Sequence, residues 1–336
     1  MRIESYQHRH AGHCESGVMS SLLSHQGLAL SEPMAFGLSS ALVFVHFPFV
    51  RVGGVALTSY RMPPGHIVKG LERSLGVRME RRRYRDAERG MRELDSLLEA
   101  GQPVGVQTSV YWLPYFPPDM RFHFNAHNLI IFGREDDEYL VSDPVAEHPQ
   151  RIKREDLKKA RFVRGPFAPR GLMYYPVGTP QEIDLARAVP KAIRRTLNIN
   201  TRLPLPLVGL PAIRRMAKTM RELPRKHPDP RYQRLFVGSI VRMQEEIGTG
   251  GGGFRFIHAA FLQEAGKALD RESLLEASER MTDAGDQWRR FALLGARFVK
   301  AKEPAPDAFE GLAQSLLECA DAERVAYAAL RQAVAK

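Results

Sequence analysis

The sequence has little cysteine and no apolar segment that clearly spans a membrane. Only two of the 336 residues are cysteine, Cys14 and Cys319, which excludes a disulfide-stabilised scaffold and a zinc site built from several cysteines. So few cysteines suit a reducing compartment, and no signal-peptide pattern opens the sequence. We therefore expect a cytoplasmic protein.

Charged residues are missing from one stretch, residues 33–50, whose length of 18 residues is the lower limit for a transmembrane helix. Pro33, Gly37 and Pro48 interrupt this stretch, so we expect a buried helix that runs into a strand. Hydrophobic residues make up 44% of the sequence and charged residues 26%, which is typical of a folded protein rather than a disordered one.

Positive charge is concentrated in the middle of the sequence. The segment 151–226 holds 19 Lys and Arg against 5 Asp and Glu, a net charge of +14, while the whole chain carries +11. Such a segment attracts an acidic partner: a nucleic acid, an anionic lipid surface or an acidic protein. A solvated face without a partner gives the same pattern. Because no zinc-finger or RNA-binding signature accompanies the charge, nucleic-acid binding is not expected, and peripheral membrane contact is not favoured.

The spacing of apolar and turn residues divides the sequence near residue 178. Helical spacing follows Cys14 and covers 86–100, whereas short β-branched and aromatic runs from residue 103 onward predict consecutive strands. Beyond residue 179 only helical patterns remain. They cover residues 181–198, 211–223, 230–247, 254–269, 271–300 and 306–334. We expect an α+β domain over 1–178 and an all-helical domain over 179–336.

Three polar residues have the local settings that nucleophilic catalysis needs. Cys14 follows the turn HRHAGHC and opens a helix, where unpaired backbone N–H groups stabilise a thiolate. His127 begins the apolar strand HNLIIFG and Asp143 ends the next strand, so an imidazole and a carboxylate are expected side by side. Together they supply a nucleophile, a base and an orienting acid. Each residue alone also fits a structural role, as a buried thiol, a strand-end histidine or an Asp-Pro turn.

Several short strings of the sequence resemble one known family. GHCESG, SEPMAFG, YWLPYF, AHNLIIFG and VSDP resemble the N-terminal domain of the butirosin biosynthesis protein H family, and IGTGGGGFR over 247–255 resembles the helical domain that accompanies it. The resemblance implies a papain-like fold, related to the bacteriocin-processing peptidases, and transfer of an acyl group from an acyl carrier protein thioester. It implies that Cys14 accepts the acyl group, His127 acts as base and then acid, and Asp143 orients the ring.

The oxyanion hole is the part of the site where the sequence departs from this resemblance. The related peptidases have a Gln six residues before the Cys, whereas His8 occupies that position here. An imidazole can donate one hydrogen bond, as can the Cys14 backbone N–H. The sequence therefore favours His8 as the side-chain donor, with His13 as the second candidate.

Candidate substrate contacts come from an acidic residue, an aromatic loop and a glycine run. Glu32 is either a helix cap or a substrate carboxylate, and the loop 111–116 either walls an acyl pocket or packs internally. The four glycines at 250–253 either approach a phosphate-like group or form a flexible linker, since they lack the Lys-Ser/Thr of a nucleotide-binding loop. The expected substrate-binding residues are Glu32, Tyr111, Trp112, Tyr115, Gly251, Gly252 and Arg255.

These features together predict a cysteine-dependent acyltransferase with a small-molecule acceptor, an amine or a hydroxyl. The alternative is a cysteine peptidase or an amidase/thioesterase on the same fold, with water in place of the acceptor. An acidic acyl carrier protein is expected at the segment 151–226, its phosphopantetheine arm delivering the acyl group. No metal or bound cofactor is expected. The non-enzyme alternative is a basic nucleic-acid-binding protein, which would bind with a steep salt dependence. The sequence leaves the acyl group and the oligomeric state open.

Overall fold

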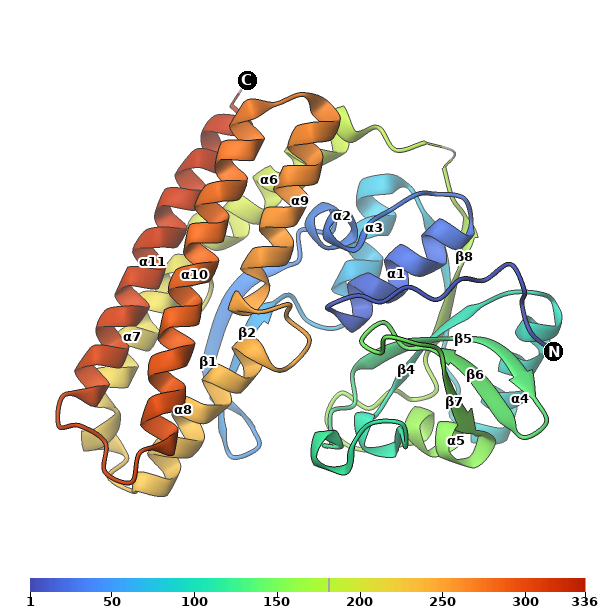
Figure 1. Cartoon of the computed structure of the whole chain (residues 1–336), viewed down its shortest axis with the longest axis horizontal. Helices are drawn as coiled ribbons and strands as arrows, with labels where there is room; N and C mark the ends of the chain where they lie inside the picture. Colours follow the sequence, from blue (N-terminus) through green and yellow to red (C-terminus); the bar gives the residue numbers. More distant parts are fainter. Residues whose placement is uncertain (181, 336) are drawn as a thin grey trace. The chain divides into compact units, whose positions relative to one another are not determined.

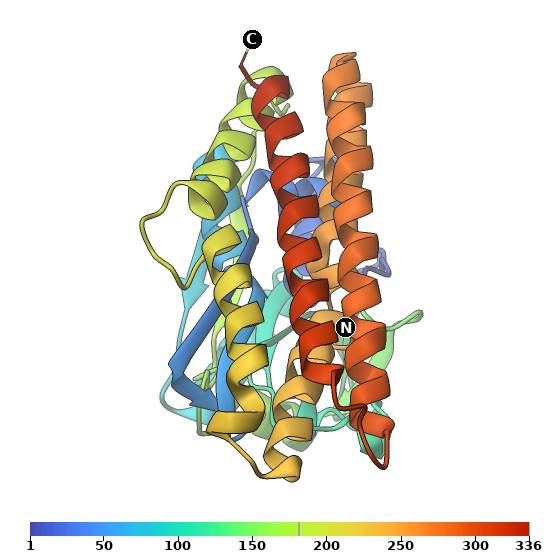
Figure 2. The same cartoon turned by 90° about the vertical axis from the view of Figure 1, so that its left-hand side faces the viewer.

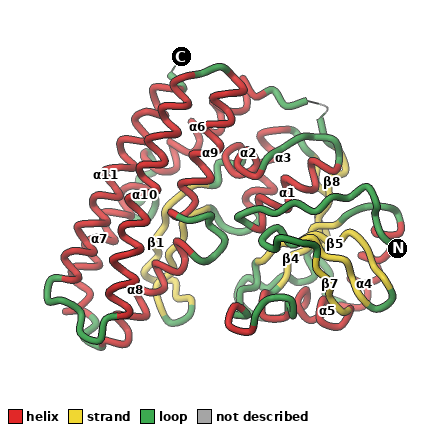
Figure 3. Tube along the Cα trace, viewed as in Figure 1, coloured by secondary structure: helices red, strands yellow, loops and turns green. Residues whose placement is uncertain are grey.

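The computed structural model describes residues 1–180 and 182–335, which form two compact units (Figure 1). Unit 1 comprises Met1–Ala35 and Pro64–Ile183, and unit 2 comprises Phe36–Pro63 and Asp184–Lys336. Strands and helices mix in unit 1, whereas helices dominate unit 2 (Figure 3). The expected fold class, an α+β domain followed by a helical domain, is confirmed.

Unit 1 is built on an antiparallel six-stranded sheet in the order β3-β8-β4-β5-β6-β7. Its strands are β3 (Arg78–Arg82), β4 (Val104–Thr108), β5 (His127–Glu135), β6 (Glu138–Ser142), β7 (Gln150–Lys153) and β8 (Met173–Gly178). The first seven residues of β5 are all buried. Because consecutive strand residues point to opposite faces, both faces of the sheet are covered at β5.

Helices cover the two faces of this sheet. They are α1 (Cys14–His25), α3 (His66–Leu75), α4 (Ala87–Glu99) and α5 (Arg154–Phe162), with the short 3₁₀ turns η1 (Val110–Trp112) and η2 (Pro118–Met120). Both α1 and α4 contact β5, and α1 also contacts β4 and β8. The first ten residues of α1 are buried, so the helix opened by Cys14 is fixed against the sheet along most of its length.

Unit 2 combines a hairpin with long helices. The hairpin pairs β1 (Leu42–Val52) with β2 (Val55–Arg61). The helices are α6 (Leu185–Thr201), α7 (Gly209–Lys226), α8 (Pro230–Glu245), α9 (Arg255–Leu269), α10 (Glu272–Lys300) and α11 (Ala308–Ala333), with the short turn η3 (Gly252–Phe254) before α9. The helices α10 and α11 run side by side (Figure 2). In the expected helix over 181–198, residue 181 lies outside the described residues.

The hairpin corrects the expected division at residue 178. That division assigns Phe36–Pro63 to the first domain, whereas the structure groups this segment with the helices of unit 2. The reason is apolar packing, because the rings of Phe44 and Tyr60 contact Trp288 of α10 with centroid distances of 5.4 and 5.2 Å. Helices α7 and α8 also contact the hairpin.

The uncharged stretch 33–50 forms a short helix followed by a strand, as expected. Helix α2 (Glu32–Leu38) begins in unit 1 and ends in unit 2, and β1 follows it. Within the described ranges 1–180 and 182–335, no helix combines the length and the apolar composition that crossing a membrane requires.

Candidate active site

Cys14 is the first residue of α1, and its position is fixed by the turn that precedes it. The carboxylate of Glu32 accepts hydrogen bonds from the backbone N–H groups of Gly12 and His13, at 2.8 and 2.7 Å, and from the hydroxyl of Ser16 at 3.1 Å. The ring of His13 caps α1 by accepting from the Ser16 N–H. Both groups hold the start of the helix, and the Cys14 side chain lies there with 6% of its surface exposed.

Of the two roles expected for Glu32, the structure shows the helix cap, although the capped helix is α1 and not α2. The cap of α2 is Ser31, whose hydroxyl accepts from the Met34 N–H at 3.1 Å. The Glu32 carboxylate caps the turn before a different helix, α1, because its two oxygens face the unpaired N–H groups there. Its bonds within the protein place it beside Cys14 as a structural group.

His127 and Asp143 lie at the same edge of the sheet. His127 is the first residue of β5, and Asp143 directly follows β6, the antiparallel neighbour of β5. The two side chains form the expected hydrogen bond, His127 Nε2 to Asp143 Oδ2, at 2.7 Å. Asp143 is fully buried, and its other oxygen accepts from the Val145 N–H at 3.2 Å. Because Nε2 is bonded to the carboxylate, Nδ1 is the nitrogen left for Cys14.

The electrostatics of the site favour a thiolate beside an imidazolium. Burial raises the pKa of the Cys14 thiol, but the charge of His13 and hydrogen bonds with His127 and His13 bring this pKa well below its usual value. Burial lowers the pKa of His127, but the charge and hydrogen bond of Asp143, together with Cys14, raise it to about 10. These shifts act in the same direction, toward a thiolate at Cys14 beside a protonated His127 ring.

His8, the first candidate for the oxyanion hole, has another role in the structure. Its Nδ1 hydrogen-bonds the hydroxyl of Ser142 at 2.8 Å, and its Nε2 donates to the carbonyl of Ala146 at 3.0 Å. Both ring nitrogens thus tie the N-terminal segment to the end of β6. His13, the second candidate, caps α1 through Nδ1, and its charge lowers the pKa of Cys14.

The aromatic loop contributes two residues to the site, Tyr115 and Phe116, and the ring of Phe116 lies edge-on to that of His127 with a centroid distance of 5.8 Å. Tyr115 donates its hydroxyl to Asp143 Oδ2 at 2.8 Å, so it shares that oxygen with His127. The ring of Tyr111 stacks on His123 with a centroid distance of 4.2 Å, and Trp112 lies under the ammonium group of Lys159. Tyr111 and Trp112 therefore have packing partners, and Tyr115 holds the carboxylate of Asp143.

The glycine run and Arg255 belong to unit 2, where their polar groups are used internally. The N–H of Gly251 donates to Thr249, and that of Gly252 donates to Glu245 at 3.1 Å. Arg255 is fully buried and forms an ion pair with Glu323.

Packing accounts for these glycines better than a ligand does. A Cβ atom on Gly253 would lie 2.4 Å from the ring of Tyr60, and one on Gly252 would lie 2.8 Å from that of Phe256. Both residues also have positive φ. The run is a close-packed turn, so neither the expected phosphate-like contact nor a flexible linker describes it.

Two polar residues near Cys14 were missed by the sequence reasoning. Asn128, next to His127, has its amide nitrogen 3.9 Å from the Cys14 sulfur. Its oxygen accepts a hydrogen bond from the hydroxyl of Tyr174 on β8 at 2.9 Å. The sequence feature that could have pointed to Asn128 was its place as a polar residue at the start of an otherwise apolar run in β5.

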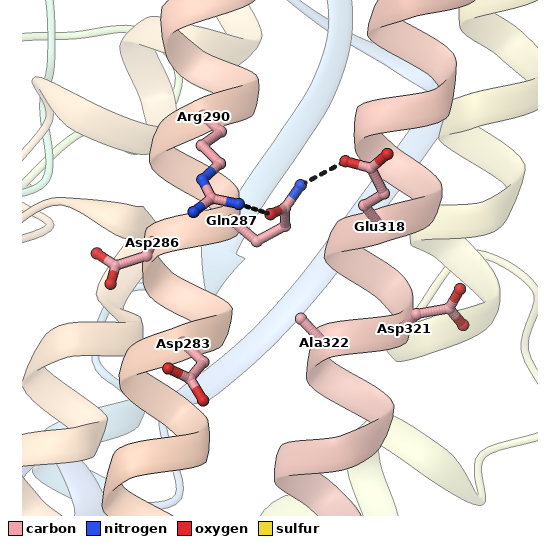
Figure 4. A pocket seen from close by; sticks show the side chains of 7 residues that line it. All are labelled: Asp283, Asp286, Gln287, Arg290, Glu318, Asp321 and Ala322. Carbon is pink, nitrogen blue, oxygen red and sulfur yellow. Dashed lines mark hydrogen bonds between the residues drawn. The ribbon is translucent and has the colours of Figure 1, made fainter.

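A surface groove of about 550 Å³ lies in unit 2 between α10 and α11 (Figure 4). Gln287 connects its two sides, donating to Glu318 at 2.7 Å and accepting from Arg290 at 3.2 Å. The other lining residues are Asp283, Asp286, Asp321 and Ala322. Across the residues that the structure describes, no three His, Cys, Asp or Glu side chains are grouped so that they hold a metal ion.

Comparisons with known proteins match both parts of the chain. Residues 13–144 match the family model for butirosin biosynthesis protein H, N-terminal, and residues 155–330 match a domain of unknown function (DUF4872). Among solved structures, the chain is similar to a C39-like peptidase from Bacillus anthracis with a TM-score of 0.37 and 15% identity. This similarity covers 53% of this chain and 98% of that one. No curated protein matches the sequence.

Proposed function

We propose, because this chain belongs to the butirosin biosynthesis protein H family, that it is a cysteine-dependent acyltransferase of a biosynthetic pathway. It takes an acyl group from the thioester of an acyl carrier protein onto Cys14 and passes it to an amine or hydroxyl acceptor. The observation that carries the proposal is the buried hydrogen bond between His127 and Asp143, together with the interactions with His13 and His127 that lower the pKa of Cys14.

The first half of the reaction uses the charges of Cys14 and His127. The Cys14 thiolate attacks the thioester carbonyl carbon, and a new C–S bond forms while the carbonyl oxygen becomes an oxyanion. The backbone N–H of Cys14, at the start of α1, is a donor for that oxyanion. When the intermediate collapses, the bond to the phosphopantetheine sulfur breaks, and His127 gives its Nδ1 proton to the departing thiolate. The products are the acylated Cys14 and a neutral His127.

The second half reverses these roles. An amine acceptor attacks the carbonyl carbon of the acyl-cysteine and passes a proton to Nδ1 of His127. Collapse of the second intermediate breaks the bond to Cys14, and the thiolate and the imidazolium are restored. Throughout both steps, Asp143 holds Nε2 and stabilises the charged ring, and Tyr115 holds Asp143.

The basic segment 151–226 supports a carrier-protein site on only part of its length. In its first part the cations of Arg154 and Lys158 pair with Glu88 within unit 1. In α6 and α7, basic side chains at helical spacing lie exposed on the surface of unit 2, where Arg214 and Lys218 also lie near the carboxylates of Asp321 and Glu222. They are Lys191, Arg194, Arg195, Arg214, Arg215 and Lys218. We therefore assign the acidic carrier protein to these two helices.

Intact-mass spectrometry tests the acyl transfer. Incubation with an acyl-loaded carrier protein should add the mass of the acyl group to the native chain and not to Cys14→Ala. Addition of an amine acceptor should then remove the adduct and yield the acylated amine. Release of the free acid at the same rate without acceptor would identify a hydrolase instead, and normal turnover by Cys14→Ala would refute the proposal.

A charge-reversal pair tests the carrier site. Arg215→Glu with Lys218→Glu should raise KM for the carrier-bound thioester and leave kcat for a small soluble thioester unchanged. Lys153→Glu with Arg164→Glu makes the same change in net charge elsewhere in the basic segment and serves as the control. Equal effects of the two pairs would show that only the overall charge matters.

A further inference from the structure

Asn128 is a buried polar residue that the reaction above does not use. The side chain is 5% exposed and lies directly after His127 in β5. Its amide group has three neighbours: the hydroxyl of Tyr174, the carbonyl of Ala126 at 3.1 Å and the sulfur of Cys14 at 3.9 Å. A buried amide with a defined partner on each side has a defined orientation.

Two of these neighbours decide which end of the amide faces the sulfur. The carbonyl of Ala126 can only accept, so it must meet the NH₂ group of Asn128. The Tyr174 hydroxyl donates to the amide oxygen, and burial raises the pKa of Tyr174 well above its usual value, so the donor proton stays in place. The second N–H of the NH₂ group is thereby left for Cys14.

The sheet is shaped so that Tyr174 can reach Asn128. In the strand order β8-β4-β5, the two residues lie on strands separated by β4. The residue of β4 opposite Tyr174 is Gly105. A Cβ atom at Gly105 would lie 2.7 Å from the Tyr174 ring, so the ring passes over β4 at the one position where no side chain stands in its way.

We infer that Asn128, held in place by Tyr174, is a positioning residue that donates an N–H to the Cys14 sulfur and stabilises its thiolate form. A thiolate accepts hydrogen bonds better than a thiol does, so this donor favours ionisation. The inference rests on the proposed function in that Cys14 is taken as the nucleophile. It adds a third group, besides His13 and His127, that sets the reactivity of this thiol.

The pH dependence of Cys14 alkylation by iodoacetamide tests this inference without any substrate. Asn128→Leu keeps the size of the side chain and removes the donor, so the pH midpoint of the reaction should rise by about 0.5 to 1 unit. Tyr174→Phe keeps the ring over Gly105 and should move the midpoint in the same direction by less. Because Tyr174 acts through Asn128, the double variant should equal Asn128→Leu alone.

Gln107→Leu is the matched control, because Gln107 is the cross-strand partner of Asn128 and a buried amide that bonds Asn125 and Phe167 instead of Cys14. An unchanged midpoint in Asn128→Leu, or an equal shift in Gln107→Leu, would overturn the inference. If Asn128→Leu does not fold, Tyr174→Phe takes its place as the test: a raised pH midpoint supports the inference, and an unchanged midpoint overturns it. The alkylation measurement uses no acyl substrate, so it remains valid even if the mass experiment shows no acyl transfer. Failure of the proposed function and failure of this inference can therefore be distinguished.

Discussion

Replacing Glu32 by alanine removes the carboxylate that holds the turn before Cys14. Three hydrogen bonds are lost, from the Gly12 N–H, the His13 N–H and the Ser16 hydroxyl. Hydrogen bonds to a charged group contribute about 1.5 to 3 kcal/mol each in buried settings, but Glu32 is partly exposed and water replaces some of them. We therefore expect a loss of about 2 to 3 kcal/mol in local stability, somewhat above the usual cost of removing a helix cap.

Hydrogen exchange of the α1 amides measures this loss, and iodoacetamide measures its effect on Cys14. Glu32→Ala should speed the exchange of the first turn of α1 and slow the alkylation of Cys14, because the N–H groups and His13 no longer hold the thiolate. Glu32→Gln keeps one acceptor oxygen and should show about half the loss of stability.

Glu72→Ala is the control, since Glu72 accepts from the Met79 N–H in unit 1 at 3.2 Å without taking part in the turn before Cys14. It should leave both the α1 exchange and the Cys14 reactivity as they are. If Glu32→Ala raised KM for the acyl substrate while α1 exchange and Cys14 alkylation stayed normal, the carboxylate would be a substrate contact and the reasoning from its hydrogen bonds would fail.

Three further predictions follow from the charges of buried groups. Peptide mass spectrometry after brief iodoacetamide treatment at neutral pH should find Cys14 modified and Cys319 intact, because burial and Glu323 raise the pKa of Cys319 well above its usual value. The pKa of His127 is about 10 in the folded protein against about 6.5 in the unfolded one, so His127 stabilises unit 1 fully below pH 6.5 and this contribution is lost as the pH rises through 10. Denaturant titrations at pH 6 and pH 10.5 should show this loss of stability, and the His127→Gln variant should lack this pH dependence. Arg255→Met leaves the buried carboxylate of Glu323 without its ion-pair partner and should lower the free energy of unfolding of unit 2 by about 3 to 5 kcal/mol. Urea denaturation measures this loss, and an unchanged stability would contradict the buried ion pair.

Local patterns in the sequence were sufficient for several elements of unit 1. Helical spacing over 86–100 predicted α4, and the apolar run after His127 predicted β5, since in both the burial of side chains follows a short-range period. Strands β3 and β7 were not predicted. Their sequences, RMERR and QRIK, are mostly charged, and they pair because neighbouring strands offer free edges rather than because their own residues favour a strand.

The hydrogen-bond partners of each site residue were less predictable than the placement of His127 beside Asp143. Spacing placed His127 beside Asp143, because adjacent antiparallel strands bring their ends to one edge. It said nothing about the direction of the Tyr115 hydroxyl, the ring nitrogens of His8 or the amide of Asn128, which depend on contacts between residues far apart in the sequence.

The path of the chain between the two units has a consequence for how the protein is made. The hairpin of Phe36–Pro63 leaves the ribosome early, but the helices that it packs against begin at Leu185 and include Trp288 of α10. At roughly 5 to 20 residues per second, the hairpin waits on the order of ten seconds or more for these partners, with Phe44 and Tyr60 uncovered. During synthesis this segment is therefore a natural binding site for a chaperone, and a chain that stops near residue 178 would keep the same apolar hairpin exposed for good.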